Sequence, residues 1–132
     1  MKIKEIWKNY KLCKIFPALK LDIFYRNTYL DLIPKGWHDI ILTMLDEIES
    51  VCGEDVYRKY SFADIKEKWY ELDIIHNSIN EEDLSNLFTE EEEKKIIDIE
   101  NKFINISRQV CANCGRSLRD KEVYICSECK EY

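Results

Sequence analysis

Apolar residues recur at helical spacing in three parts of this chain. The clearest pattern predicts an amphipathic helix over residues 37–52, and Gly53 directly after it is a typical C-terminal stop. A shorter pattern predicts a helix over residues 2–14, which Pro17 then interrupts. The apolar stripe of the 37–52 helix comprises Trp37, Ile40, Ile41, Met44, Leu45, Ile48, Val51 and Cys52.

A third helix is predicted over residues 90–109. Thr89 and Glu92 have the spacing of a capping box, and the four glutamates at 90–93 suit the positive end of a helix dipole. A solvated, well-charged helix start is the favoured interpretation of these glutamates, with an interaction surface as the alternative. The residues that trace this helix at a period of 3.6 are Ile96, Ile97, Glu100, Phe103, Ile104, Ser107 and Val110.

The chain between these two helices carries shorter patterns. Ser61 is expected to cap a brief helix over residues 62–69. Alternation of apolar and acidic residues over 70–74 then predicts a short strand. The brief helix is expected to dock on helix 37–52 through one face, formed by Phe62, Ile65 and Trp69.

The remaining segments have weaker signals. Residues 19–33 are aromatic and are expected to be irregular or partly extended, until the turn signal Pro34-Lys35-Gly36. Residues 77–88 are expected to form an exposed connection with at most a turn of helix at 81–87.

These elements together predict a mainly α fold with a short β element. Only three glycines and two prolines occur, which is too few for the many tight turns of an all-β sandwich. We expect a helical body over residues 1–110. A C-terminal four-cysteine zinc ribbon or knuckle over residues 111–132 should follow it and pack on the end of helix 90–109.

Charge is distributed unevenly along the chain. The formal net charge is −6, yet residues 1–35 hold eight Lys or Arg and three Asp or Glu, a net charge of +5. Residues 54–106 hold seven bases and fifteen acids, a net charge of −8. An acidic chain is a poor match for phosphate binding, so only the N-terminal third offers a basic footprint.

Nothing in the sequence predicts a membrane or secretory segment. No apolar stretch approaches the roughly 20 residues that span a bilayer, and lysines interrupt the apolar positions at the start of the chain. We therefore expect a soluble, intracellular protein. Thiols stay reduced in that compartment, and paired cysteines there more often bind metal than form disulfides.

The strongest chemical signal is the spacing C-x₂-C-x₁₁-C-x₂-C near the C-terminus, formed by Cys111, Cys114, Cys126 and Cys129. Each C-x₂-C can form a tight turn whose two sulfurs converge, and two such turns create the tetrahedral S₄ site that Zn²⁺ prefers. Gly115 lets the backbone turn under the metal, and residues 123–125 are expected to pair as a strand before the second turn. We predict one structural Zn²⁺ on these four cysteines.

Three alternatives to zinc stay open. Iron fits an S₄ site chemically, two CxxC disulfides need an oxidising compartment or a redox role, and four unligated thiols would leave a short tail with almost no core. A catalytic zinc is disfavoured because four protein sulfurs leave no coordination position for water.

No second reactive constellation is apparent. Cys13 and Cys52 lie on apolar helix faces and are expected to be packing residues. His38 and His76 are isolated in sequence, and His76 is expected to be half-exposed at the end of the strand. We therefore predict that the protein is not an enzyme, with no catalytic residues.

Three blocks of residues resemble a family of small zinc-ribbon proteins found in phages, prophages and bacterial genomes. The blocks are Gly36-Trp37 at the start of a helix, the segment Phe62-Ala63-Asp64-Ile65-Lys66-Glu67-Lys68-Trp69-Tyr70-Glu71-Leu72-Asp73-Ile74, and a helix with Ile96 or Ile97, Glu100 and Ser107 before Cys111–Gly115. Two positions depart from the family: Tyr70 replaces its usual glycine and Asp73 its usual arginine. The resemblance covers roughly residues 36–129 and implies a zinc-binding fold in a mobile genetic element, and therefore a place in the cytoplasm of a bacterial host cell. It brings no established activity.

Two functions from different classes follow. The first is a non-enzymatic, zinc-binding protein–protein interaction module. One version of it is a phage-type inhibitor, anti-CRISPR-like or otherwise anti-defence, whose acidic 81–100 stretch meets a basic, nucleic-acid-handling host protein. Lys66 and Lys68 are a second candidate surface.

The second function is nucleic-acid binding through the ribbon and the basic, aromatic N-terminal third, where lysines interleave with Trp7, Tyr10 and Phe16. The favoured interpretation of these aromatic residues is that they belong to the core and that the lysines form a solvated helix face.

Overall fold

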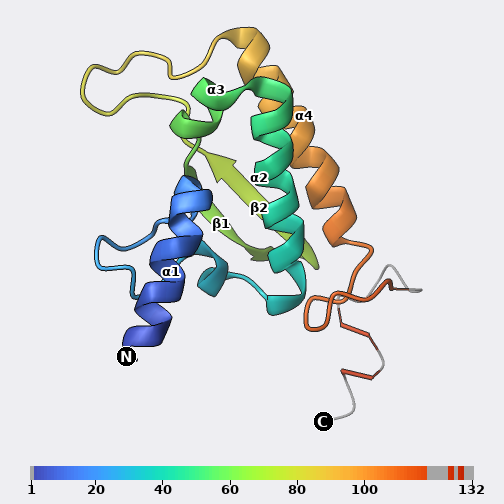
Figure 1. The fold of residues 1–132 in the computed structure, drawn as a ribbon. Helices are drawn as coiled ribbons and strands as arrows, with labels where there is room; N and C mark the ends of the chain where they lie inside the picture. The colour runs from blue at the N-terminus through green and yellow to red at the C-terminus, as the bar shows by residue number, and fades with distance from the viewer. Residues whose placement is uncertain (1, 119–124, 127, 130–132) are drawn as a thin grey trace.

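The computed structural model describes residues 2–118, 125, 126, 128 and 129. They form a mainly α fold with a short β element, as the sequence predicts, and this element is a two-stranded antiparallel sheet (Figure 1). The helices are α1 (Ile3–Ile15), α2 (His38–Cys52), α3 (Glu54–Lys59) and α4 (Glu90–Ser107), the strands are β1 (Phe62–Lys68) and β2 (Glu71–His76), and three short 3₁₀ turns are η1 (Pro17–Leu19), η2 (Tyr29–Leu32) and η3 (Lys35–Trp37).

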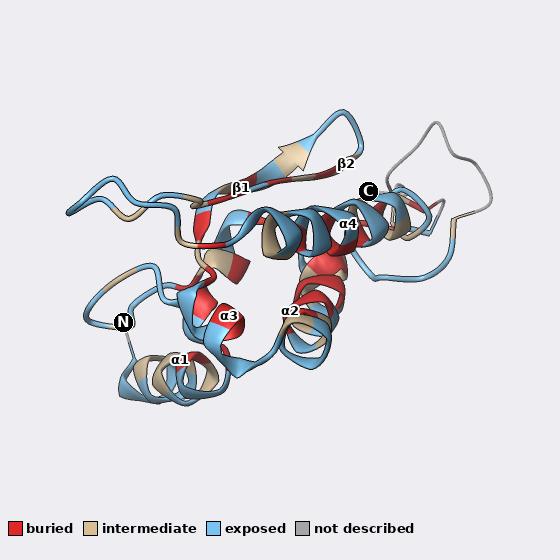
Figure 2. Ribbon diagram, turned by 90° about the horizontal axis from the view of Figure 1, so that it is seen from above, coloured by how far each residue is buried: buried red, intermediate tan, exposed pale blue. Residues whose placement is uncertain are grey.

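Helix α4 contacts both α2 and β2, and it lies between α2 and the β hairpin in the view of Figure 2. The faces that meet are apolar, so the core forms where these elements face one another, while the outer faces are exposed (Figure 2). Helix α1 lies at the edge of this arrangement, next to η1. The fully buried apolar side chains of the core include Leu19, Trp37, Ile41, Met44, Leu45, Ile48, Tyr60, Ile65, Leu72 and Ile96.

The helix predicted over residues 37–52 is confirmed as η3 followed by α2. Its inward face is the predicted stripe, apart from Val51, which is 52% exposed. Gly53 ends the helix with a positive φ of 95°, a conformation that glycine adopts without strain. Helix α3 follows directly and was not predicted, because its six residues are too few to show a helical period. The Tyr57 hydroxyl of α3 donates a hydrogen bond to the Ile15 carbonyl and so fixes the end of α1.

The capping box at the start of α4 is also confirmed. The Thr89 hydroxyl accepts from the Glu92 backbone N–H, and the Glu92 carboxylate accepts from the Thr89 N–H. The helix ends at Ser107, two residues before the predicted end. One predicted inward residue is wrong: Ile97 is 44% exposed, and Ile99 is buried in its place. The buried face follows the steps of three and four residues, and Ile97 lies one residue beyond that stripe.

The brief helix predicted over residues 62–69 is wrong, because the segment is strand β1. Phe62 and Ile65 are both buried, and their separation of three residues suggested a helix. The register shows why both point inward: Phe62 pairs with His76 and Asp64 with Ile75, so Ala63 is an extra residue in a β-bulge. The bulge shifts the alternation by one position, and Ile65 therefore returns to the core face.

The hairpin tip is formed by two aromatic residues. Trp69 and Tyr70 both have positive φ, at 54° and 69°, as a two-residue turn between antiparallel strands requires. Trp69 is 83% exposed and does not join the helical face that the sequence suggested. The predicted strand over 70–74 corresponds to β2, which begins one residue later and continues to His76.

The helix predicted over residues 2–14 is confirmed as α1, which buries only Cys13 fully. Residues 20–28 are irregular with one isolated bridge, Lys20 to Thr28, before η2. The connection over residues 77–88 has a turn at 81–83 and no helix, and a bridge joins Ile79 to Asn86. No helix in the described part of the chain is long and apolar enough to cross a bilayer.

Candidate metal centre

The first cysteine turn begins directly after α4. The Cys111 N–H donates to the Arg116 carbonyl at 2.7 Å, and the Gly115 N–H donates back to the Cys111 carbonyl at 2.8 Å. An isolated bridge joins Val110 to Ser117 and closes the turn. Gly115 has a φ of +80°, which a residue with a Cβ rarely adopts. These bonds hold Cys111 and Cys114 on the same side of one tight turn.

All four predicted ligands are brought together. The sulfurs of Cys111, Cys114, Cys126 and Cys129 lie within 4.8 Å of one another, and the Cys114 and Cys126 sulfurs are 3.7 Å apart. A tetrahedral S₄ site with Zn–S bonds of about 2.3 Å requires sulfurs about 3.8 Å apart. The described cysteines are all free thiols. The donor set therefore fits a divalent metal ion such as zinc.

The local backbone favours a negative charge on the first sulfur. Burial alone would raise the pKa of the Cys111 thiol, but N–H groups of Cys126, Cys114 and Asn113 point at its sulfur and lower the pKa to about 6. The Cys126 N–H lies 3.2 Å from that sulfur. Thiolates are the species that bind zinc, so this turn is arranged for a cation.

Charged residues join the two turns from outside. The Arg116 guanidinium lies 2.5 Å from the Glu128 carboxylate, which connects the first turn to the second. A hydrogen bond to the Cys114 sulfur and the Glu128 charge raise the pKa of Arg116. The strand predicted at residues 123–125 falls largely outside the described residues.

The first turn contacts the body at η3 by backbone groups. The Gly36 N–H donates to the Ala112 carbonyl at 2.6 Å, and Ala112 is buried with the core. A Cβ on Gly36 would overlap the Cys111 and Ala112 carbonyls, and a Cβ on Gly115 would lie 3.2 Å from the Gly36 carbonyl. Gly36 is therefore required for the close approach of the η3 backbone to the backbone at Cys111 and Ala112. The turn signal Pro34-Lys35-Gly36 did not reveal this role.

The hairpin supports the same end of α4. The buried Ser107 hydroxyl accepts a hydrogen bond from the Leu72 N–H at 2.9 Å and donates to the Ile104 carbonyl at 2.5 Å. Arg108 forms an ion pair with Glu71 at the start of β2. The segment that leads into Cys111 is thus held by the hairpin on one side and by η3 on the other.

The other two cysteines lie outside the cluster. Cys13 is buried and Cys52 is half-buried, in line with the packing roles expected for them. Burial raises the pKa of both thiols, which disfavours the reactive thiolate. The ring of His38 contacts the Ile33 carbonyl, at 3.3 Å.

His76 is not half-exposed as expected: its ring is buried and lies between two carboxylates. Its Nδ1 is 2.9 Å from Glu100 Oε2, and its Nε2 is 3.0 Å from Glu93 Oε2. The Tyr60 hydroxyl donates to Glu100 at 2.7 Å, and the Tyr60 ring stacks on the imidazole. Burial lowers the pKa of His76, but the bonds and charges of Glu100 and Glu93 outweigh it and raise the pKa.

Sequence reasoning missed this buried network, although two signals were present. His76 continues the alternation that buries Leu72 and Ile74, so it faces the core. Glu100 lies within the apolar stripe of α4, where a carboxylate needs a partner. The network connects β2, α4 and the residue that follows α3.

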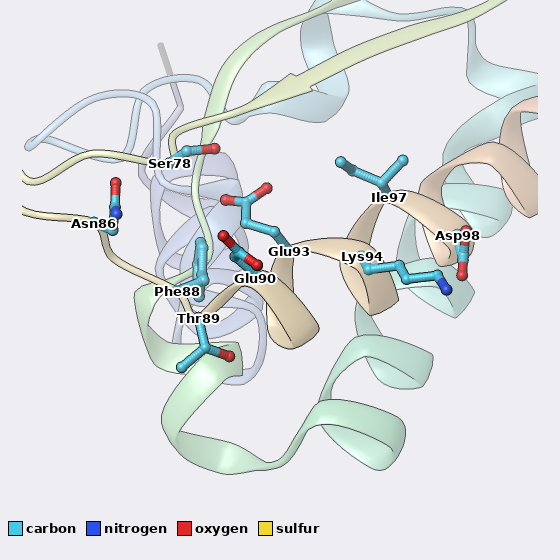
Figure 3. A pocket seen from close by; sticks show the side chains of 9 residues that line it. All are labelled: Ser78, Asn86, Phe88, Thr89, Glu90, Glu93, Lys94, Ile97 and Asp98. Atoms are coloured by element: carbon cyan, nitrogen blue, oxygen red, sulfur yellow. The ribbon is translucent and has the colours of Figure 1, made fainter.

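A surface depression of about 640 Å³ lies beside this network (Figure 3). Phe88, whose ring contacts His76 edge-on, lines it together with Glu93. Glu93 Oε1 is buried and has no hydrogen-bond partner among the described residues. The other lining residues are Ser78, Asn86, Thr89, Glu90, Lys94, Ile97 and Asp98.

No protein-family model, curated protein or solved structure matches this chain.

Proposed function

We propose that Cys111, Cys114, Cys126 and Cys129 bind one structural Zn²⁺ and that the protein is a non-enzymatic, zinc-stabilised interaction module. The convergence of the four sulfurs carries the proposal. Four protein thiolates occupy all four coordination positions of a tetrahedral zinc ion. The metal would therefore cross-link the chain and leave no position for a reacting water. The resemblance to small zinc-ribbon proteins of phages and prophages supports the same assignment.

Metal analysis of the untagged protein tests the zinc site. We expect one zinc per chain in the wild type and less than roughly a tenth of that in Cys114→Ser. Cys52→Ser is the matched control, because it removes a half-buried thiol outside the cluster and should keep the zinc. Iron at one per chain would make iron, not zinc, the bound metal. An equal metal content in Cys114→Ser and Cys52→Ser would contradict the metal site.

The depression beside Glu93 favours a protein partner with a basic surface. A carboxylate oxygen that is buried without a partner is costly, and an arginine or lysine from another protein would satisfy it. The acidic surface around it is smaller than the whole 81–100 stretch, because Glu100 is buried and Glu92 caps α4. Its exposed members are Glu81, Glu82, Asp83, Glu90, Glu91 and Asp98.

Nucleic-acid-handling proteins are partners of the required chemistry, because they present basic surfaces to phosphate. Occupation of such a surface by an acidic protein would exclude the nucleic acid. This is the inhibitor version of the proposal, of an anti-CRISPR-like or other anti-defence type. The charge of the surface and the resemblance to phage proteins support it.

Capture from a bacterial lysate, with matched variants, tests the protein-binding role. Wild type should retain a basic protein that elutes with salt, and Glu90→Lys with Asp98→Lys should lose it. Glu54→Lys is the control, because Glu54 is an exposed acid on α3, away from the depression. Retention that does not differ between these variants would contradict a role for this surface.

A further inference from the structure

The surface formed by α1 and the loop after it combines exposed aromatic rings with cations. Trp7 and Tyr10 stack with ring centroids 5.5 Å apart and planes 14° from parallel. Tyr10 also contacts Tyr25 of the loop edge-on at 5.1 Å. The amide of Asn9 donates to the Tyr25 carbonyl at 2.9 Å and holds the loop against the helix. We call this set of residues, with the cations on it, the aromatic–cation surface.

Each ring of this surface has a cation over it. Lys11 lies 5.3 Å from the Trp7 ring, Lys14 lies 5.1 Å from Tyr10, and Lys20 lies 5.2 Å from Tyr25. At the edge of the surface, Arg26 lies 5.4 Å from Phe24. These contacts place positive charge directly beside flat apolar rings.

The favoured core interpretation of these aromatic residues is wrong for Trp7, because the Trp7 side chain is 57% exposed. Phe24, in the loop, is 63% exposed. Phe16, by contrast, is buried and packs in the core as expected. Helix α1 lies at the edge of the molecule with its outer face open (Figure 2). A tryptophan that the core does not use is available for a ligand.

Among the cations of this region, Arg26 is paired with an acid of the described chain, whereas the lysines are not. Asp22 is engaged by Arg26 and by the Phe24 N–H, and Asp31 accepts from the Thr28 N–H. The exposed lysines form no ion pair within the described part of the chain, and they are Lys4, Lys8, Lys11, Lys14 and Lys20. The surface therefore keeps most of the +5 charge of residues 1–35 in a protein whose net charge is −6.

We infer that the aromatic–cation surface binds single-stranded nucleic acid. Unpaired bases offer flat faces that stack on exposed aromatic rings, and the neighbouring lysines meet the phosphates. A duplex hides its base faces, so it would use the lysines and leave the rings without a role. An acidic protein would likewise use only the charges. The exposed Trp7 ring, stacked on the half-buried Tyr10, therefore favours a single strand. This inference does not depend on the zinc site or on the depression beside Glu93.

Fluorescence anisotropy with a labelled 15-mer of deoxythymidine tests the inference, with the full chain at about 50 mM salt. Wild type should bind, and Trp7→Ala should weaken binding about tenfold, because stacking of one base is lost. Trp7→Phe should recover part of the affinity. Lys11→Gln should reduce the slope of log K against log salt by about 0.7, since one phosphate contact is removed.

Trp69→Ala and Lys66→Gln are the matched controls, as both side chains are exposed on the hairpin, away from α1. They should bind the 15-mer like wild type. Far-ultraviolet circular dichroism checks that Trp7→Ala keeps its helices.

Three results would overturn the inference: no binding at that low salt concentration, equal binding by wild type and Trp7→Ala, or equal loss in Trp69→Ala. Displacement by polyglutamate as effective as by unlabelled 15-mer would assign the surface to an acidic protein. If a duplex bound as tightly as the single strand, binding by this surface would depend on its lysines alone and not on base stacking.

Discussion

The body around α2 and the cysteine turns after α4 differ in what they bury. Helix α2 alone places five apolar side chains in the core, among them Ile41, Met44 and Leu45, which are fully buried. In the described part of residues 111–129, only Ala112 joins that core, and Cys111 and Cys126 are buried against each other's turn. The body is therefore stabilised by apolar burial, whereas the cysteine turns need a cross-link.

This difference shows which interactions each region depends on. A short segment with one core residue cannot offset its own conformational entropy by burial. The proposed binding of one ion to four thiolates would provide the missing free energy, as in small zinc domains, where the binding free energy is the folding free energy. Changes in the metal should consequently act on the cysteine turns first, and changes in the core should act on the body first.

The largest expected effect is the response to metal removal. Chelation should abolish protection of amides 110–118 against hydrogen exchange, because zinc binding of about 10–16 kcal/mol in small zinc domains is lost there. Protection in α2 should remain. Exchange measured by mass spectrometry with and without chelator checks this. Equal loss of protection in α2 would show that the two regions do not differ as stated.

The next effect is a core truncation in the body. Leu45→Ala removes a fully buried side chain and should lower the free energy of unfolding by about 2–5 kcal/mol. Zinc content should stay at one per chain. Urea denaturation with metal analysis checks both. Val51→Ala on the same helix is the control. Because the Val51 side chain is half-exposed, this change should lower the free energy of unfolding by well under that amount.

A smaller effect is expected where the two regions meet. Gly36→Ala places a Cβ against the Cys111 and Ala112 carbonyls and should cost about 1–3 kcal/mol through local strain. The zinc should remain bound, with weaker affinity in competition against a chelator. Lys35→Ala, at the exposed neighbouring position, should behave like wild type in that competition. An unchanged zinc affinity in Gly36→Ala would show that the contact between η3 and the first cysteine turn does not stabilise the metal site.

The smallest effect concerns pH and the body alone. The folded-state pKa of His76 is raised by Glu100 and Glu93, so the protonated ring stabilises the fold fully below its ordinary pKa of about 6.5. This stabilisation is lost as pH rises through the raised pKa. Between the ordinary pKa of histidine and the raised pKa of His76, we expect the free energy of unfolding to decrease by about 1 kcal/mol. Urea titrations from about pH 6 to 9 measure it, and an equally steep decrease in His76→Gln would contradict it.

Regular patterns made most of the body predictable. Helix α2, the Thr89 cap and the two C-x₂-C pairs follow from spacing alone, because each is specified within a few neighbouring residues. The strand β1 was not predictable in this way, since the bulge at Ala63 depends on pairing with β2 and gives Phe62 and Ile65 a helical spacing. The fit of Gly36 against Ala112 likewise joins residues that are distant in the chain.

The candidate site divides in the same way. The C-x₂-C pairs are local signals, and they identified residues whose sulfurs the fold brings within 4.8 Å of one another. The His76 network joins β2 with α4, and His76 appeared isolated in the sequence because its partners lie in a different element. Exposure of Trp7 depends on how α1 sits at the edge of the core, and its helical pattern alone suggested burial.

X-ray absorption spectroscopy at the zinc edge of the purified protein tests the central claim most directly. We predict a single shell of four sulfur neighbours at about 2.3 Å. A shell that contains nitrogen or oxygen ligands, or the absence of a zinc edge at one metal per chain, would contradict it.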